Sequence, residues 1–246
     1  MDLGDLLADA VDLSVVIPTL DERENIRLLI ERLVPTLDEA GIEAEIIVVD
    51  DDSADRTWET ATELSERLGH IVVIRRRDRR GIASAWAEGC RASRGSFIAL
   101  MDGDLAHSPE DLVRLYEACT GGGHDMVIGS RYLPDAGGMR EKSRLAVAAS
   151  KVAQRLTRAA LGVEGTDITH SFRVFRREVW GAIGGEIAGG GNVFLAEFVY
   201  RARAEGFGVA ELPITYGRRL YGRTKLSLAR ETLRYLHRLW QLRRSQ

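Results

Sequence analysis

Two carboxylates one residue apart follow an apolar run in the segment FIALMDGDL, residues 97–105. Asp102 and Asp104 lie on the same side of an extended backbone, and Gly103 between them permits close approach of backbone or ligand. Neighbouring carboxylates repel each other unless a cation or hydrogen bonds offset their charge. One interpretation is a divalent metal shared with substrate phosphates. The other is a solvated turn in which Asp makes local hydrogen bonds.

A second acidic cluster lies in VVDDDSADRT, residues 48–57, again directly after an apolar run. Asp50 and Asp51 are candidates for hydrogen bonding a ribose or a base. Asp52 or Ser53 is a candidate N-cap for a following helix. The pattern alone leaves ligand binding and helix capping open.

The acids at 110 and 111 have a structural explanation. Ser108 is a good N-cap, and Pro109 suits the first helical position because its missing N–H is not needed there. Glu110 and Asp111 then lie in the first turn, where negative charge is favoured by the helix dipole. This short stretch therefore predicts a helix start, without a functional role for either acid.

The elements that position these residues alternate along the chain. Short apolar runs rich in β-branched residues predict buried strands at 13–19, 45–50, 70–76, 96–102 and 125–130. Helical patterns occupy 22–40, 55–68, 82–92 and 109–119, with Pro35 expected to end or kink the first. This alternation predicts an α/β protein with a mostly parallel sheet. Ligands bind beyond the carboxyl ends of such strands, where both acidic clusters lie.

The chain beyond about residue 131 is less regular. We expect a helix near 142–161, a strand within 171–176, a helix near 193–205 and a strand near 207–213. A basic C-terminal helix follows. We find no internal repeat and no low-complexity linker.

Composition excludes several classes of protein. The 246 residues are 45% hydrophobic and 29% charged, with a formal net charge of -3, which is typical of a globular domain and not of a nucleic-acid-binding one. The two cysteines have no metal-ligand spacing and fit a reducing cytoplasm. The acidic N-terminus lacks the basic region of a secretory signal, and no apolar run reaches the about 18 residues that a spanning helix needs.

Basic charge is concentrated at the C-terminus, where residues 218–246 contain nine Lys or Arg and one acidic residue. An apolar stripe at spacings of three and four runs through the same segment: Leu226, Ala229, Leu233, Leu236 and Trp240. A basic amphipathic helix of this kind can lie on an anionic membrane surface. The alternative is that the stripe packs on the protein core.

Several segments together are more specific than any one of them. They are VVIPTLDERENI (15–26), EIIVVDDDSADRT (45–57), RRGIASAWAEGCRASRG (79–95), MDGDLAHSPEDL (101–112), DMVIGSRYLPDAGG (125–138), DITHSFRVFRREV (167–179) and RRLYGRTKLS (218–227). In this order they resemble family 2 glycosyltransferases, and most closely the dolichol-phosphate (polyprenyl-phosphate) mannosyltransferase group. The resemblance covers roughly residues 12 to 228. It implies an A-type glycosyltransferase fold, with a catalytic domain over 1–223 and the amphipathic helix over 224–246.

The resemblance also implies site residues. Those that match nucleotide-sugar contacts are Pro18, Thr19, Glu22, Asp50, Asp51 and Asp102. Asp102 and Asp104 match the metal-binding Asp-x-Asp that holds the donor diphosphate through Mg²⁺ or Mn²⁺. The residues that match positions binding donor or acceptor phosphate are Arg131, Arg219 and Lys225, with a looser match at Arg144.

The implied reaction moves a hexose, with mannose as the expected sugar, from a nucleotide diphosphate sugar such as GDP-mannose to a polyprenyl phosphate, with inversion. Such an enzyme is expected to be cytoplasmic and peripheral at the cytoplasmic membrane face. One alternative is a saccharide or small-molecule acceptor; another is a non-catalytic nucleotide-sugar binding module. The oligomeric state is not indicated.

The chain departs from the family pattern at a few positions. Leu20 removes a base-stacking surface that a Tyr commonly supplies, and Ala106 stands where a polar residue is usual. His170 and Ser171 replace part of the common Thr-Ser-Gly-Phe-Arg. We interpret His170 as a polar wall of the pocket in preference to a catalytic base.

Overall fold

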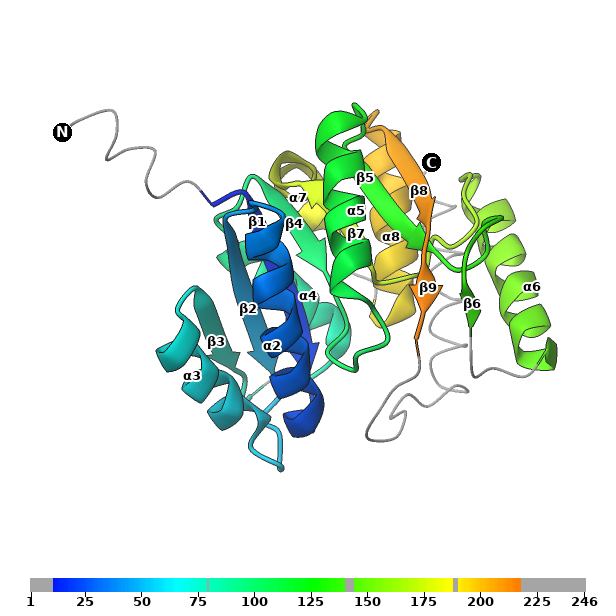
Figure 1. The fold of residues 1–246 in the computed structure, drawn as a ribbon. Coiled ribbons are helices and arrows are strands. Elements are labelled where there is room, and N and C mark those ends of the chain that lie inside the picture. Colours follow the sequence, from blue (N-terminus) through cyan, green and yellow to red (C-terminus); the bar gives the residue numbers. More distant parts are fainter. Residues whose placement is uncertain (1–10, 79, 140–143, 188–189, 218–246) are drawn as a thin grey trace, which may run out of the picture.

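The structure is a computed structural model that describes residues 11–78, 80–139, 144–187 and 190–217. A seven-stranded sheet in the order β3-β2-β1-β4-β7-β5-β8 forms its centre (Figure 1). A separate two-stranded ribbon pairs β6 with β9. The sheet confirms the α/β class predicted from the alternating pattern.

The first half of the chain alternates strands and helices. These elements are β1 (Leu13–Thr19), α2 (Arg23–Glu39), β2 (Ala44–Asp50), α3 (Thr57–Leu68), β3 (Ile71–Arg75), α4 (Ile82–Ala92), β4 (Phe97–Leu100), α5 (Pro109–Gly121) and β5 (Met126–Ser130). β1 is parallel to both β2 and β4, and β2 is parallel to β3. Their carboxyl ends therefore lie at one edge of the sheet.

The second half adds shorter elements. They are β6 (Gly138–Met139), α6 (Arg144–Leu161), β7 (Arg173–Arg176), α7 (Arg177–Ile183), a 3₁₀ turn η1 (Gly184–Glu186), α8 (Asn192–Ala204), β8 (Val209–Pro213) and β9 (Thr215–Tyr216). β7 enters the sheet between β4 and β5 and is antiparallel to both. β8 extends the sheet parallel to β5. Because β7 reverses, β4 and β5 point the same way.

Alternating side chains of the central strands feed two separate cores. Val15 and Ile17 of β1 face the helices α2, α3 and α5, with partners such as Leu29. Val16, between them in the sequence, faces α4, α7 and α8. Figure 1 shows α2 and α5 in front of the sheet and α4 and α8 behind it. Burial on both faces explains why these strands read as continuous apolar runs.

Several local predictions can be compared with the structure. α2 runs past Pro35 to Glu39, so the expectation that Pro35 ends it is wrong. The predicted strand within 171–176 is shorter, at Arg173–Arg176, and the β6–β9 ribbon was not predicted. The proposed C-terminal helix, 224–246, lies outside the described residues, so it stays a prediction.

Tight packing of α4 on β1 generates a test of the fold. A Cβ added at Gly89 of α4 would lie 2.2 Å from Cγ1 of Val16. We expect Gly89→Ala to lower the free energy of unfolding by about 1–2 kcal/mol, because overpacking outweighs the gain of up to about 1 kcal/mol in helix propensity. Urea unfolding followed by circular dichroism measures the change.

Gly181 of α7 is the matched control, since it is helical and has nothing within 4 Å of an added Cβ. Gly181→Ala should leave the stability unchanged or raise it by up to about 1 kcal/mol. Equal effects at the two glycines would show that α4 does not pack on β1 as described.

Candidate active site

The candidate site lies at the edge of the sheet where β1, β2, β4 and β5 end. The turn after β4 carries Asp102 and Asp104, as predicted. Gly103 between them packs against the end of β1, where an added Cβ would lie 3.3 Å from Cγ2 of both Ile17 and Thr19. A side chain at this position would crowd the end of β1, so the glycine favours the close approach of the turn to that strand end.

The two carboxylates of this turn differ in exposure. The Asp102 side chain is 26% exposed, whereas Asp104 as a residue is 7% exposed. Oδ1 of Asp104 accepts a hydrogen bond from the Ala106 N–H at 3.1 Å. Leu105 between them takes a positive φ of 65°, so the backbone turns sharply here. Ala106 is buried and, as the sequence predicted, has no polar side chain that could bind a metal.

Asp50, at the end of β2, is fully buried. Its Oδ2 accepts hydrogen bonds from Thr19 Oγ1 at 2.8 Å and from Ser53 Oγ at 2.6 Å. Its Oδ1 accepts a third from the Ser53 N–H at 2.8 Å. In this structure Asp50 therefore ties the ends of β1 and β2 to the loop that follows β2.

Asp51 forms a buried ion pair with Arg76, which follows β3. Oδ1 of Asp51 accepts from Nε of Arg76 at 2.7 Å and also from its Nη2. Oδ2 of Asp51 accepts from the Gly81 N–H at 2.6 Å, and Nη1 of Arg76 donates to Ser84 Oγ at 2.8 Å. The acidic cluster is thereby joined to the start of α4.

The β1 loop contains the remaining predicted nucleotide contacts. Pro18 is partly buried and pairs in register with Val49 of β2. Glu22 precedes α2; its N–H donates to Thr57 Oγ1 at 2.9 Å, and its Oε2 accepts from Asn25 Nδ2. Pro18, Thr19, Glu22, Asp50 and Asp51 therefore lie together around two adjacent strand ends.

Arg131 follows β5 and is held by Asp167. Its Nε and Nη2 donate to the two Asp167 oxygens at 2.7 and 2.9 Å, and its N–H donates to Oδ2 at 3.1 Å. Asp167 is completely buried. Burial disfavours the charge of Arg131, but hydrogen bonding and the charge of Asp167 outweigh it and raise the pKa of Arg131. Arg131 is thus a fixed cation whose Nη1 is not used by Asp167.

Two buried histidines lie between the Asp102 turn and the end of β5. Nδ1 of His107 accepts from the Asp102 N–H at 3.1 Å, and Nε2 of His107 lies 3.3 Å from Nε2 of His170. Nδ1 of His170 is 2.7 Å from the Gly129 carbonyl oxygen. Burial lowers the pKa of His107 to about 4 and the pKa of His170 well below its usual value. Both rings are therefore neutral at pH 7.

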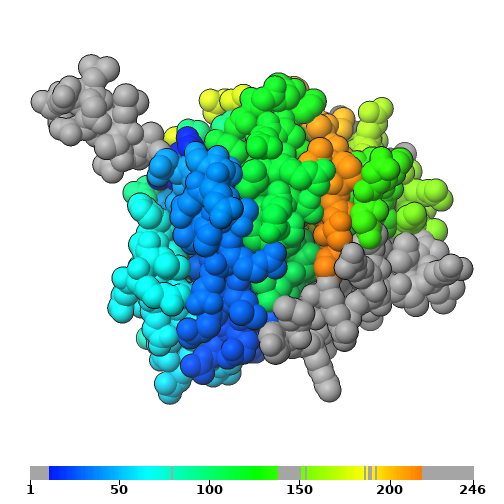
Figure 2. All heavy atoms as spheres, viewed as in Figure 1, coloured from blue at the N-terminus to red at the C-terminus, as the bar shows by residue number. Residues whose placement is uncertain are grey.

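Tyr216 of β9 connects the parts of the site. Its ring lies 5.7 Å from the His107 ring and 5.6 Å from the His170 ring, and the Arg131 guanidinium carbon is 5.3 Å from its centroid. The next residue, Gly217, donates its N–H to the Ala106 carbonyl at 2.8 Å. Figure 2 shows the segment of β8 and β9, in orange, at the surface beside α5. Asp102, Asp104 and Arg131 therefore belong to one continuous site.

Some predicted residues lie elsewhere or cannot be placed. Arg219 and Lys225 lie outside the described residues, and so does the side chain of Arg144. Glu197 of α8 is buried and accepts a hydrogen bond from Arg201 Nε at 3.0 Å.

The capping predictions have mixed outcomes. Ser108 caps α5, since its Oγ accepts from the Asp111 N–H at 3.0 Å. The expectation that Asp52 or Ser53 caps α3 is wrong. Ser53 is bound to Asp50, and Asp52 accepts from Arg75 Nε at 2.6 Å. The α3 start is instead ordered by Asp55, whose Oδ1 accepts from the Thr57 N–H at 3.0 Å.

Sequence reasoning missed several residues of the site. They are Arg76, His107, Asp167 and Tyr216. Arg76 has a sequence signal, because basic residues follow β3 where acids follow the adjacent β2. Asp167 and Tyr216 lacked one, because their partners lie far away in the sequence. His107 has a near partner in the Asp102 N–H, but its other partner, His170, is 63 residues away.

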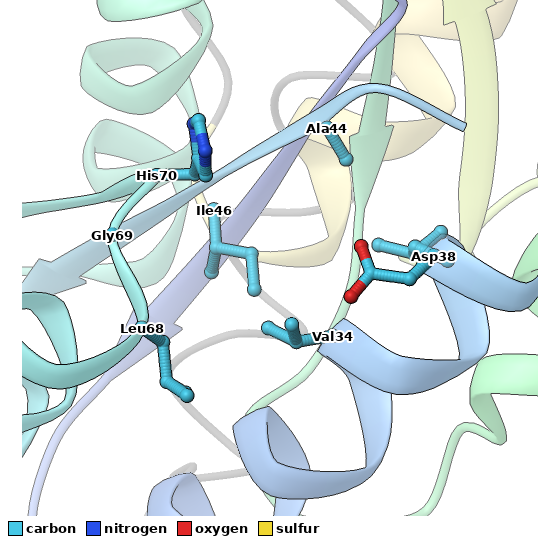
Figure 3. A pocket seen from close by; sticks show the side chains of 8 residues that line it. Val34, Asp38, Ala44, Ile46, Leu68, Gly69 and His70 are labelled. Atoms are coloured by element: carbon cyan, nitrogen blue, oxygen red, sulfur yellow. The ribbon is translucent and has the colours of Figure 1, made fainter. Parts of the chain in front are cut away.

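A small surface hollow lies at the opposite end of the sheet (Figure 3). Val34, Ala44, Ile46 and Leu68 contribute apolar walls between α2, β2 and α3, and Figure 3 shows the Asp38 carboxylate at its edge. Because Ala44 begins β2, the hollow is separated from the carboxyl-end site by the length of the strand. Leu37, Gly69 and His70 complete its lining.

Curated relatives resemble most of the chain. A dolichol-phosphate mannosyltransferase from Pyrococcus furiosus is 37% identical in an alignment of 236 residues that covers 92% of this chain. A polyprenol monophosphomannose synthase from Mycolicibacterium smegmatis is 37% identical in an alignment of 218 residues that covers 87% of this chain. The chain spans 63% of the length of the first relative and 80% of the second.

Solved structures share the fold at low sequence identity. Glucosyl-3-phosphoglycerate synthase from Mycobacterium tuberculosis superposes with a TM-score of 0.70 at 19% identity, covering 99% of this chain and 84% of its own. That structure contains Mn²⁺, UDP-glucose and phosphoglyceric acid. A second structure of the same enzyme, with Mg²⁺ and UDP, also has a TM-score of 0.70, with 98% of this chain and 83% of its own covered. The likeness supports the A-type glycosyltransferase fold.

A family model described as glycosyl transferase family 2 matches residues 14–184, which include β1 to α7 and both candidate carboxylates. This match covers more than half of the chain, and the curated relatives agree with it. The chain belongs to glycosyl transferase family 2.

Proposed function

We propose that the chain is an inverting hexosyltransferase that moves mannose from GDP-mannose to a polyprenyl phosphate. The observation that carries this proposal is the placement of the Asp102–Asp104 turn and the fixed cation Arg131 in one site, joined by Tyr216. Carboxylates suit a metal-bound donor diphosphate, and a cation suits an acceptor phosphate. The names of the two curated relatives support mannose as the sugar and a polyprenol as the lipid.

The Asp102–Asp104 turn fits a hard divalent cation. Mg²⁺ and Mn²⁺ prefer oxygen ligands and are commonly held by one or two carboxylates together with substrate phosphates. Within the described ranges, no three His, Cys, Asp or Glu side chains form a metal cage, so the donor phosphates would complete the coordination. When bound, Mg²⁺ or Mn²⁺ would offset the negative charge that develops on the leaving diphosphate.

The loops after β1 and β2 are proposed to receive the nucleotide. Pro18, Thr19 and Glu22 border one side, and Asp50 and Asp51 border the other. Since Asp50 and Thr19 hydrogen bond each other, we assign them the role of fixing the loops that face the nucleotide. The branched network of Asp51 gives the same rigidity on the α4 side.

The acceptor side requires little help from a general base. A phosphate monoester has a second pKa of about 6, so it is mostly doubly ionised at pH 7. Its oxygen can therefore act as the nucleophile without a base to remove a proton. His170 fits this expectation, because its Nδ1 is bound to the Gly129 carbonyl and its Nε2 faces His107. Arg131 would neutralise and orient the phosphate, and Arg219 and Lys225 are proposed to assist.

One prediction of the proposed function concerns the Asp102–Asp104 turn. We expect Asp104→Ala to reduce transfer by at least about 100-fold, because charge stabilisation at the leaving group is lost. The assay supplies GDP-mannose, Mn²⁺ or Mg²⁺ and a polyprenyl phosphate, and follows labelled sugar into the organic phase. Glu110→Ala is the control, since it removes an exposed carboxylate from the first turn of α5, where it pairs with Arg32, away from the proposed ligands.

The same assay separates the alternatives. Sugar that reaches only a water-soluble acceptor would contradict the lipid-phosphate acceptor. Donor binding without turnover on any acceptor would favour a non-catalytic nucleotide-sugar binding module. Transfer by the wild-type chain in the absence of a divalent metal would contradict the proposed role of Asp102 and Asp104.

A second prediction concerns Arg131. We expect Arg131→Lys to raise the KM for polyprenyl phosphate about tenfold with the KM for donor unchanged, because Lys keeps the charge but lacks the planar fork that pairs with Asp167. Steady-state kinetics with each substrate varied in turn measures both constants. A rise in the donor KM alone would place Arg131 on the donor side.

We also propose that the protein makes peripheral contact with a membrane. The C-terminal helix proposed to make it lies outside the described residues, but α6 offers a second basic amphipathic surface. Its sequence contains no acidic residue. Val152 and Leu156 are 51% and 67% exposed, and Lys151 and Arg155 beside them are also exposed. No helix in the part of the chain that the structure describes has the length and hydrophobicity to span a bilayer.

The inner face of α6 links this surface to the acceptor side. Gln154 donates to Asp167 Oδ1 at 3.0 Å, and Asp167 in turn holds Arg131. A lipid surface against α6 would therefore bring lipid headgroups close to the arginine proposed to bind the acceptor phosphate. Apolar residues with flanking Lys and Arg are the pattern of helices that lie in a membrane interface.

We expect the double variant Val152→Glu and Leu156→Glu to weaken binding to vesicles of phosphatidylglycerol at least about tenfold, because it adds charge repulsion and removes apolar contact. Vesicle co-sedimentation measures the binding. Leu28→Glu on α2 is the matched control, since Leu28 is a 39% exposed leucine on a different helix. Equal effects at both places would contradict contact through α6.

A further inference from the structure

His107 and His170 are buried beside the site, yet no step of the proposed reaction uses them. They are 1% and 3% exposed. His107 lies three residues after Asp104, and His170 lies in the loop before β7. Because their contacts join the Asp102 turn to the end of β5, the pair spans the two halves of the site.

The contacts determine which nitrogen of each ring carries the proton. A carbonyl oxygen only accepts, so Nδ1 of His170 must donate to Gly129. A backbone N–H only donates, so Nδ1 of His107 must accept from Asp102. Because Nδ1 of His107 accepts, that ring carries its proton on Nε2, and Nε2–H of His107 donates to Nε2 of His170 at 3.3 Å. Three hydrogen bonds thus run in one direction from Asp102 to Gly129.

Packing holds both rings in this arrangement. The Phe172 ring stacks on the His107 ring at 4.3 Å between centroids, with an angle of 11° between planes. The two histidine rings meet edge to face, at 83°. The Tyr216 ring also contacts both histidine rings, at centroid distances of 5.7 and 5.6 Å. A turned ring would replace a nitrogen with a carbon and break the chain of hydrogen bonds.

We propose that His170 is a positioning residue, which fixes His107 and through it the backbone of the metal-binding Asp102. The inference rests on the proposed function, because it takes Asp102 as a metal ligand. β4 ends at Leu100, so the Asp102 N–H lies beyond the sheet and His107 supplies its acceptor. His107 in turn has a buried N–H, and His170 provides the acceptor that this N–H requires.

A neutral connection has an electrostatic advantage at this position. Oδ2 of Asp102 lies 3.8 Å from Nε2 of His107, so a cationic ring here would pair with the carboxylate and compete with a divalent ion. Hydrogen-bonded neutral rings order the turn without that competition. Residues that orient a metal ligand in this way commonly change metal affinity about 10- to 100-fold when removed.

The first test reads the protons directly. In the full chain, labelled with ¹⁵N-histidine and without nucleotide or metal, we expect His170 as the Nδ1–H tautomer and His107 as the Nε2–H tautomer at pH 7. Two-dimensional NMR of the imidazole nitrogens, assigned with His170→Gln, measures this. A mixture of tautomers at either ring, or a charged ring, would show that the three hydrogen bonds do not run as proposed. This outcome does not depend on whether the protein is a transferase.

The second test separates positioning from mere packing. We expect His170→Phe to weaken Mn²⁺ binding in the presence of GDP about tenfold, and His170→Gln to stay within about threefold of wild type. Gln retains one N–H for Gly129 and one oxygen for His107, whereas Phe only fills the space. Electron paramagnetic resonance of free Mn²⁺ gives the affinities, and thermal unfolding checks that both variants fold.

Wild-type affinity in both variants, or an equal loss in both, would overturn the positioning role. Failure of the wild-type chain to bind Mn²⁺ with GDP would instead contradict the metal site in the proposed function. If His170→Phe fails to fold, the comparison of His170→Gln with wild type and the tautomers of the wild-type chain still decide the inference.

Discussion

The second half of the structure depends on the hydrogen bonds and the ion pair of the buried Asp167. Charge in a buried place is costly unless it is paired and hydrogen bonded. Asp167 receives hydrogen bonds from Arg131 after β5 and from Gln154 of α6. Its own N–H is held by Glu211 of β8, which also binds Thr166. Asp167 thereby ties three elements together, two through its carboxylate and one through its N–H, and Arg131 cannot move away without leaving the carboxylate without its ion pair.

The first half of the structure uses its carboxylates in two ways. Asp50 and Asp51 are buried and hydrogen bonded by Thr19, Ser53 and Arg76, so their charge stabilises the loops around the strand ends. The Asp102 turn is more exposed, and the hydrogen bond from the Asp102 N–H to Nδ1 of His107 holds its backbone. The difference explains how a sheet edge with many acids can contain both a rigid frame and the proposed cation site.

Regular periodicity made the first half of the fold predictable. Strands and helices up to β5 follow from apolar runs and helix starts such as Ser108, because each is a local signal. The reversal of β7 was not predictable in this way, since Arg173–Arg176 pairs with strands more than 40 residues earlier in the sequence. A strand pattern states that a segment is extended but not which neighbour it takes.

The candidate site shows the same division. The spacing of Asp102 and Asp104 could be recognised in the sequence because both residues lie in one turn. The hydrogen-bond partners of Asp50 could not be recognised, and Ser53, which is one of them, was predicted to be a helix cap. His107 was missed because its role depends on His170, 63 residues away. Residue type and local spacing identify groups that could bind a ligand. Only the folded structure shows which of those groups the protein itself already uses.

The proposed reaction also requires a fixed spacing between the two halves, because transfer needs a donor and an acceptor phosphate at a defined separation. A salt bridge between them would alter the charge of one side. The histidine pair avoids this, since Asp102 and Gly129 are connected by neutral rings while Arg131 keeps its charge balanced by Asp167. Aromatic contacts from Phe172 and Tyr216 supply stiffness without charge. The neutral rings therefore connect the two sides without disturbing the Arg131–Asp167 ion pair or the charge of the Asp102 carboxylate.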